Sequence, residues 1–185
     1  MSELSLRLAQ GDRAQRKTLI TVAEWAPVTG SGEEKVREIL GARTEDSSIE
    51  FNPDVATSTD ILGTTYTDVN KTEPSQSFDP YYILGGSKLS EYLVQAALEN
   101  DIQKYNGKFT IYIIAAFIND GANGITDANN YKAIKHTGCS IIPQSIGGDA
   151  YTGMPIEVHY SNTITVGTVN ELSDKFEFTP VDEIS

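Results

Sequence analysis

The clearest hydrophobic pattern of the chain runs through residues 87–118. Ser87 opens it, and its hydroxyl is suited to accept a hydrogen bond from an amide of a first helical turn. A helix over residues 87–103 would carry a single apolar stripe, because small and branched apolar residues recur there at helical spacing. The stripe consists of Leu89, Leu93, Ala96 and Ala97.

The residues after this helix predict the strand that it covers. Asn106 and Gly107 tolerate positive φ and predict a sharp turn. Residues 109–118 are rich in aromatic and β-branched side chains, which makes them too apolar for a strand with water on both faces. We expect helix–sheet packing between the stripe and three of these residues: Phe109, Ile111 and Ile113.

Shorter stretches with the two-residue period of strands lie on both sides of the helix. The predicted strands cover residues 18–25, 43–51, 131–137, 139–146, 154–160 and 164–169. Residues 33–41 are predicted as a short helical turn or an irregular crossing, and residues 119–130 as a polar loop. Several short strands and one helix predict a mainly β protein, a two-sheet sandwich or barrel with one flanking helix.

Residues 55–80 form a long polar segment. They are dense in Thr, Ser and Asp, and their few large apolar residues are too widely spaced for a helix. We predict one or two long, solvent-facing strands with an extended loop. Irregular segments of such length within a domain are usually functional.

The length of 185 residues predicts a single domain over residues 1–185. Residues 1–17 and 170–185 are candidate N-terminal and C-terminal arms, although the alternating leucines of the first segment also fit a short edge strand. No apolar run approaches the roughly 20 residues of a membrane helix. The first residues also lack the basic start and apolar centre of a secretory signal, so we expect synthesis in a cytoplasm without a membrane anchor.

The charge is strongly acidic and unevenly distributed. The formal net charge is −12, of which residues 44–79 carry −7. Nucleic-acid affinity depends mainly on Lys and Arg that neutralise phosphates. We therefore expect no tight binding to a duplex, and solubility is the simplest interpretation of the acidity.

Few residues are suited to catalysis or to metal binding. His136 and Cys139 have a spacing that suits metal ligands, but only His159 remains to join them, whereas structural zinc takes four ligands. Phosphate-binding glycine loops, the nucleophile elbow and the EF-hand spacing are missing. The Gly-Gly-Ser at residues 85–87 fits either an anion site at a helix start or, more simply, a corner. We expect no enzyme, no cofactor and no metal.

Three stretches carry a family resemblance through their order along the chain. They are residues 45–54 (EDSSIEFNPD), 59–80 (TDILGTTYTDVNKTEPSQSFDP) and 138–149 (GCSIIPQSIGGD), with the helix between the last two. In this combination the chain resembles the major tail proteins (tail tube proteins) of long-tailed bacteriophages, most closely those with flexible, non-contractile tails. The resemblance covers residues 18–170.

The resemblance implies a two-sheet β-sandwich with one helix, copies that close into rings of six, and rings that stack into a tube. DNA passes through such a tube without specific binding. The implied partners are other copies, a tape-measure protein, and the tail terminator and tail-tip proteins. The implied location is the virion tail, after synthesis in the bacterial host. A loop between early strands bridges successive rings in this family, and the candidates for that contact here are Asp54, Asp60, Tyr66 and Asp68.

Other functions remain open from the sequence. A tube subunit of a contractile tail or of a secretion machine would share the fold. A β-sandwich that binds carbohydrate or a host surface would need exposed aromatic residues, for which Tyr81, Tyr82 and Tyr151 are the candidates. A small hydrolase would need two carboxylates that converge in a pocket.

Overall fold

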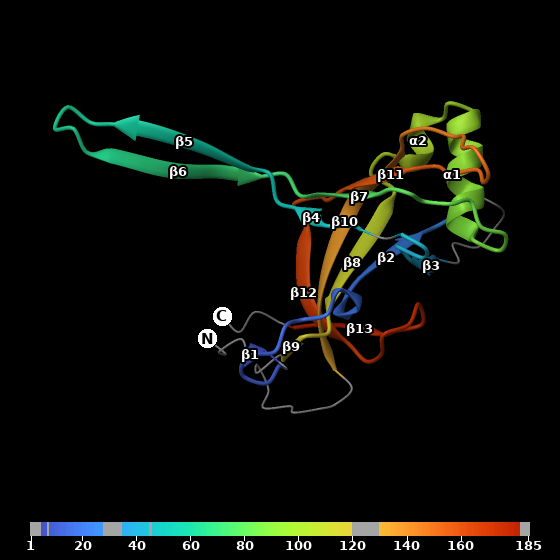
Figure 1. Cartoon of the computed structure of the whole chain (residues 1–185), viewed down its shortest axis with the longest axis horizontal. Helices are drawn as coiled ribbons and strands as arrows, with labels where there is room; N and C mark the ends of the chain where they lie inside the picture. Colours follow the sequence, from blue (N-terminus) through green and yellow to red (C-terminus); the bar gives the residue numbers. More distant parts are fainter. Residues whose placement is uncertain (1–4, 7, 28–34, 45, 120–129, 182–185) are drawn as a thin grey trace.

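The structure, a computed structural model, describes residues 5–6, 8–27, 35–44, 46–119 and 130–181. Within these ranges the protein is mainly β, with a curled antiparallel sheet that forms a half-barrel and a helical segment beside it (Figure 1). The predicted class, mainly β with one flanking helical segment, is confirmed. The two halves of the large sheet share one strand.

The large sheet has nine strands in the described residues. Its main path runs in the order β3-β2-β8-β10-β11-β7-β4, while β12 pairs with β10 and β13 pairs with β12. The strands are β2 (Leu19–Trp25), β3 (Val36–Ile39), β4 (Ile49–Glu50), β7 (Ser75–Phe78), β8 (Phe109–Ala115), β10 (Tyr131–Pro143), β11 (Ile156–His159), β12 (Ile164–Val169) and β13 (Phe178–Pro180). Two smaller sheets pair β1 (Ser5–Leu6) with β9 (Ile118–Asn119), and β5 (Pro53–Thr59) with β6 (Thr65–Thr72).

Strand β10 joins the two halves of the large sheet. Residues 132–137 pair with β8, and residues 140–143 pair with β11. The register shifts between Thr137 and Cys139, and Gly138 between them has a φ of 83°. A bulge with positive φ bends a strand, and glycine adopts that φ without steric cost. The two strands expected on either side of Gly138 are therefore one bent strand.

The helical segment begins at the predicted cap but is divided in two. Ser87 accepts a hydrogen bond from the Ser90 amide (3.0 Å) at the start of α1 (Lys88–Leu98). Asn100 then has a φ of 53°, and Asp101 caps the short α2 (Ile102–Tyr105). The prediction of one helix over residues 87–103 is wrong in this respect, because a left-handed residue ends α1.

The main core lies between α1 and one face of the sheet. Leu89, Leu93 and Ala96 are buried, and Ala97 is half-buried. On the sheet, Phe109 and Ile111 are buried and Ile113 is half-buried, and all three belong to the cluster that contains Leu89 and Leu93. The helix thus covers the apolar face of β8, together with buried residues of neighbouring strands: Ala23, Trp25, Cys139, Ile141, Ile156 and Val158.

A second apolar cluster lies on the opposite face of the same strands. The described part of the C-terminal segment covers this face, since Phe176 is buried and β13 pairs with β12. Residues 170–181, expected as part of an arm, thus pack against the sheet of their own chain. The cluster consists of Val22, Tyr112, Ile114, Ala133, Val169 and Phe176.

Two local predictions before the helix are wrong. Among the described residues of the range 33–41, strand β3 pairs with β2. The free energy of this strand pairing outweighs the weak helical pattern of the local sequence. The strand predicted over residues 43–51 shrinks to β4, because Arg43 takes a left-handed φ of 62° in a turn. Of the loop predicted over residues 119–130, residues 120–129 lie outside the described ranges. Among the described residues, no helix has the length and apolar character needed to cross a membrane.

Replacing Leu93 with Ala should lower the free energy of unfolding by about 2–5 kcal/mol, because it opens a cavity between α1 and the sheet. Leu98 on the same helix is 74% exposed, so Leu98→Ala should change stability by less than about 0.5 kcal/mol. Urea unfolding followed by circular dichroism measures both. Equal effects of the two substitutions would contradict the assigned face.

Candidate functional site

The two strands β5 and β6 form a hairpin that projects away from the large sheet and from the helix (Figure 1). Every residue of both strands is exposed. The four residues expected at an inter-ring contact lie on this hairpin: Asp54, Asp60, Tyr66 and Asp68. The structure therefore brings these four residues together on one arm, where Asp54, Tyr66 and Asp68 are exposed and Asp60 is half-buried in the turn at the tip.

Asn52 and Pro74 separate the hairpin from the large sheet. Asn52 has a φ of 44°, and its Nδ2 donates to the Glu73 carbonyl (3.1 Å) and to Ser75 Oγ (3.2 Å). Pro74 lies between the end of β6 and the start of β7, and it has no backbone amide to donate to a neighbouring strand. The chain leaves and re-enters the sheet at these residues, which fixes the base of the hairpin.

The hairpin has two different faces. Residues directly opposite in an antiparallel pair share a face, and successive residues alternate between faces. One face is made only of β-branched side chains in three facing pairs: Val55 with Val69, Thr57 with Thr67, and Thr59 with Thr65. The other face carries Ala56, Ser58, Tyr66 and Asp68.

Asp60 organises the tip of the hairpin. Its Oδ1 accepts from the amides of Leu62 and Thr64 (2.9 Å each), and its Oδ2 accepts from the Tyr66 hydroxyl (3.2 Å). The hydrogen bond from Thr64, with those from Leu62 and Tyr66, lowers the pKa of Asp60 below its usual value. This ordered turn presents Ile61 and Leu62 to solvent, with exposed fractions of 102% and 85%.

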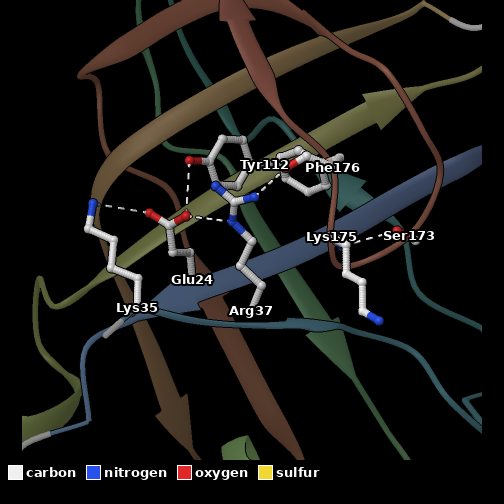
Figure 2. Close-up of polar contacts among 7 residues, drawn as sticks. All are labelled: Glu24, Lys35, Arg37, Tyr112, Ser173, Lys175 and Phe176. Carbon is white, nitrogen blue, oxygen red and sulfur yellow. Dashed lines mark hydrogen bonds and ion pairs between the residues drawn. The ribbon is translucent and has the colours of Figure 1, made fainter. Parts of the chain in front are cut away.

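A buried ion pair, which the sequence analysis did not identify, lies on the second apolar face (Figure 2). Arg37 Nε of β3 lies 2.6 Å from Oε2 of the buried Glu24, and Arg37 Nη1 donates to the Phe176 carbonyl (2.5 Å). Lys35 Nζ reaches Glu24 Oε1 at 3.3 Å, and the Tyr112 hydroxyl donates to Glu24 Oε2 at 3.3 Å. Arg37 also lies over the Phe176 ring, 4.4 Å from its centroid. The group connects β2 and β3 to the C-terminal segment.

The cluster shifts the pKa values of its members in opposite directions. Burial by itself would raise the pKa of Glu24, but the Arg37 hydrogen bond and the charges of Arg37 and Lys35 together lower it. Burial, followed by the negative charge of Glu24, raises the pKa of Tyr112 to about 12. Glu24 therefore remains a carboxylate and Tyr112 a phenol near neutral pH. Sequence reasoning had only one signal for this site, a Glu within an apolar strand.

The start of α1 is occupied by a carboxylate of the same chain. Glu38 Oε1 of β3 accepts from Ser87 Oγ (2.5 Å), and Glu38 Oε2 accepts from the Leu89 amide (3.1 Å). Helix N-termini favour anions, because their amides are unpaired and the helix dipole is positive there. The anion at residues 85–87 is thus a side chain that fastens the helix to β3.

The three candidate tyrosines do not form one exposed surface. Tyr81 is buried, whereas Tyr151 is 77% exposed and meets Tyr82 edge-to-face with ring centroids 6.3 Å apart. A cavity of about 540 Å³ lies beside them, between residues 79–82 and residues 145–155. The structure therefore brings Tyr82 and Tyr151 together at a surface hollow.

His136 and Cys139 are neighbours that both contact Ser161, whereas His159 lies on β11 in a more exposed environment. His136 is buried, with its Nδ1 2.9 Å from the Ser161 carbonyl, and burial lowers its pKa. Cys139 is buried in the main core, and this burial raises its thiol pKa. His159 is partly exposed, 3.5 Å from Glu157. Among the described residues, no group of three or more potential metal ligands converges.

Comparison with known proteins gives the chain no family assignment. No protein-family model matches the chain, and no curated protein matches it at a significant level.

Replacing Glu24 with Gln should lower the free energy of unfolding at pH 7 by about 2 kcal/mol, because it leaves Arg37 without its charged partner. Fully buried pairs lose about 3–5 kcal/mol in such cases, but the Arg37 side chain is 25% exposed. The folded pKa of Glu24 lies below the ordinary glutamate value of 4.5, so this stabilisation is present above pH 4.5 and is lost as the pH falls through the folded pKa.

Urea unfolding between pH 3 and pH 7 checks this expectation, with Glu50→Gln on the exposed β4 as the control. The difference between the wild type and Glu24→Gln should shrink on acidification, while the control stays within about 0.5 kcal/mol throughout. A difference that is independent of pH would show that the charge of Glu24 contributes nothing.

Proposed function

We propose that this protein is a structural subunit that assembles with copies of itself into stacked rings and forms a tube of the phage tail type. The observation that carries this proposal is the β5–β6 hairpin. It has ordered turn chemistry, a face of β-branched residues and an apolar tip, yet every residue of both strands is exposed in the single chain.

An isolated two-stranded hairpin has marginal stability in water. The β-branched face of this hairpin is of the kind that packs well on a covered, pleated surface. At about 3.3 Å per residue, β5 and β6 extend for roughly 25 Å. An arm of this length reaches well beyond the sheet that bears it, which suits contact with another subunit.

The large sheet supports assembly through its edges. β3 and β4 stand at the two ends of its main strand order, and β13 ends the branch beside β10. Strand edges offer unpaired amides and carbonyls to another chain. Copies that pair edge to edge around an axis close a ring and remove these edges.

The charge suits a conduit for DNA. Each copy has a net charge of −12, and many copies in a ring multiply it. A channel of the same sign as phosphate would let DNA pass without binding, and the repulsion would act over about 8–10 Å at physiological salt. We extend the proposal to the partners of such tubes: a tape-measure protein within, and terminator and tip proteins at the ends. A contractile tail or a secretion machine uses the same type of subunit.

A second candidate function is recognition of a carbohydrate at the hollow beside Tyr82 and Tyr151. The exposed ring of Tyr151 and the cavity of about 540 Å³ favour it. A glycan-binding screen that compares the wild type with Tyr151→Ala tests it. Loss of a specific signal in the variant would support this function, and no specific signal in the wild type would reject it.

A variant without the hairpin tests whether assembly requires the hairpin while the rest of the chain still folds. Residues 55–70 are replaced by Asn-Gly, which joins Asp54 to Lys71 through a two-residue turn. The removed residues make few contacts with the core, so urea unfolding should change by less than about 1 kcal/mol. We expect rings or tubes with a central hole from the wild type in negative-stain electron microscopy and none from the variant.

Two results would contradict the proposal. Wild-type protein that stays a monomer of 20.2 kDa at high concentration, both alone and with a tail-tip complex added as initiator, would reject self-assembly. Normal tubes from the variant would show that the hairpin is not the contact between copies.

A further inference from the structure

We propose that the hairpin tip of one copy inserts Ile61 and Leu62 into a cavity beside β2 and β3 of a second copy. This inference rests on the proposed self-assembly and names the surface that receives the arm. In the following, the acceptor cavity means the hollow lined by Arg16, Lys17, Leu19, Ile20, Thr21, Ile39, Leu40, Gly41, Ala42, Thr44, Ser47 and Phe78.

The hairpin tip presents exposed apolar side chains on a preformed turn. The exposed fractions of Ile61 and Leu62 are 102% and 85%, so neither side chain packs substantially against its own chain. Asp60 holds the turn that presents them through hydrogen bonds to two amides and to Tyr66. Burial of two such side chains is favourable, and an ordered turn loses little conformational entropy on binding.

The acceptor cavity has a matching size and composition. Its volume is about 570 Å³, within the range of pockets that bind ligands of this size. Apolar atoms supply most of its lining, which includes Leu19, Ile20, Ile39, Leu40 and Phe78. Ile39 is 38% exposed in the single chain, which leaves apolar area to be covered.

The charges of the two surfaces are complementary. Among the residues that line the acceptor cavity, two are basic, Arg16 and Lys17, and none is acidic. The hairpin and its base, residues 53–73, carry four carboxylates and one lysine, a net charge of −3. In a chain with a net charge of −12, a basic rim around an apolar hollow is an uncommon surface and favours an acidic partner.

One member of the basic rim, Arg16, is held in place within the single chain. Arg16 donates from Nη1 to the Leu19 carbonyl (2.6 Å) and from Nε and Nη2 to the Ser47 carbonyl (3.0 and 2.6 Å). These are carbonyl acceptors, and within the described part of the chain neither Arg16 nor Lys17 forms an ion pair with a carboxylate. Their positive charges remain available to the approaching hairpin.

The contact is between copies, because the hairpin of each chain points away from its own sheet (Figure 1). Donor and acceptor are different surfaces of the same chain, so the interface is head-to-tail. Such an interface continues from copy to copy until a ring closes or a filament forms. The geometry thus accounts for growth by one repeated contact.

Disulfide cross-linking tests the contact directly. Leu62→Cys and Ala42→Cys are combined in one chain, and the native Cys139 is buried with 1% exposure and should not react. Under a mild oxidant we expect a ladder of dimers, trimers and longer species that a reductant collapses. We also mix chains that carry only Leu62→Cys with chains that carry only Ala42→Cys. Cross-linking in this mixture should give a heterodimer and no longer species.

Two controls measure the specificity. In the first control, Leu62→Cys is combined with Ala150→Cys, which lies beside the hollow at Tyr82 and Tyr151. This chain should give less than a tenth of the cross-linked product of the Leu62 and Ala42 pair. Lys17→Glu in the cross-linking chain should slow ladder formation about tenfold, whereas Lys175→Glu on the exposed C-terminal segment should leave the rate within about twofold.

The outcomes distinguish this inference from the proposed function. Rings or tubes by electron microscopy without a ladder from the Leu62 and Ala42 pair would overturn the inference and leave the assembly proposal standing. An equal ladder from the Ala150 control would also overturn it. Protein that forms neither assemblies nor a ladder would overturn both.

Discussion

Strand β10 is the element on which the rest of the sheet depends. Its first half pairs with β8 and β12, and its second half pairs with β11. The bulge at Gly138 bends the strand between these two halves. This bulge bends the strand beyond the ordinary twist of a sheet, and the bend lets the two halves curl around a common core. The half-barrel therefore follows from one bent strand of thirteen residues.

The two faces of this sheet are covered by different means. Helix α1 covers one face with an apolar stripe, and Glu38 fastens its first turn to β3. The C-terminal segment covers the other face, where Arg37 joins the buried Glu24 to the Phe176 carbonyl (Figure 2). An ion pair of this kind adds little net stability relative to an apolar pair of similar volume, although removal of one partner leaves the other charge unpaired. Both covers use β3, an edge strand, as their polar anchor.

The hairpin is the part of the molecule that the single chain does not explain. Its base is fixed by Asn52 and Pro74, and its tip is ordered by Asp60, yet its β-branched face and its apolar tip meet only water. A chain gains nothing for its own fold from such an arm. The proposed contact between copies would give each of these features a physical use, and the acidity of the arm would favour the basic rim of the acceptor cavity.

The sequence by itself determined the features that local chemistry controls. The stripe from Leu89 to Ala96, the Ser87 cap and the solvent-facing character of residues 55–72 follow from periodicity, capping and polarity. The tertiary structure alone decided the rest: the pairing of β3 with β2, the return of residues 178–180 to the sheet, and the meeting of Glu24, Arg37 and Phe176. These contacts join residues up to 139 positions apart. No local pattern encodes them, because their free energy depends on which distant surfaces the folded sheet brings together.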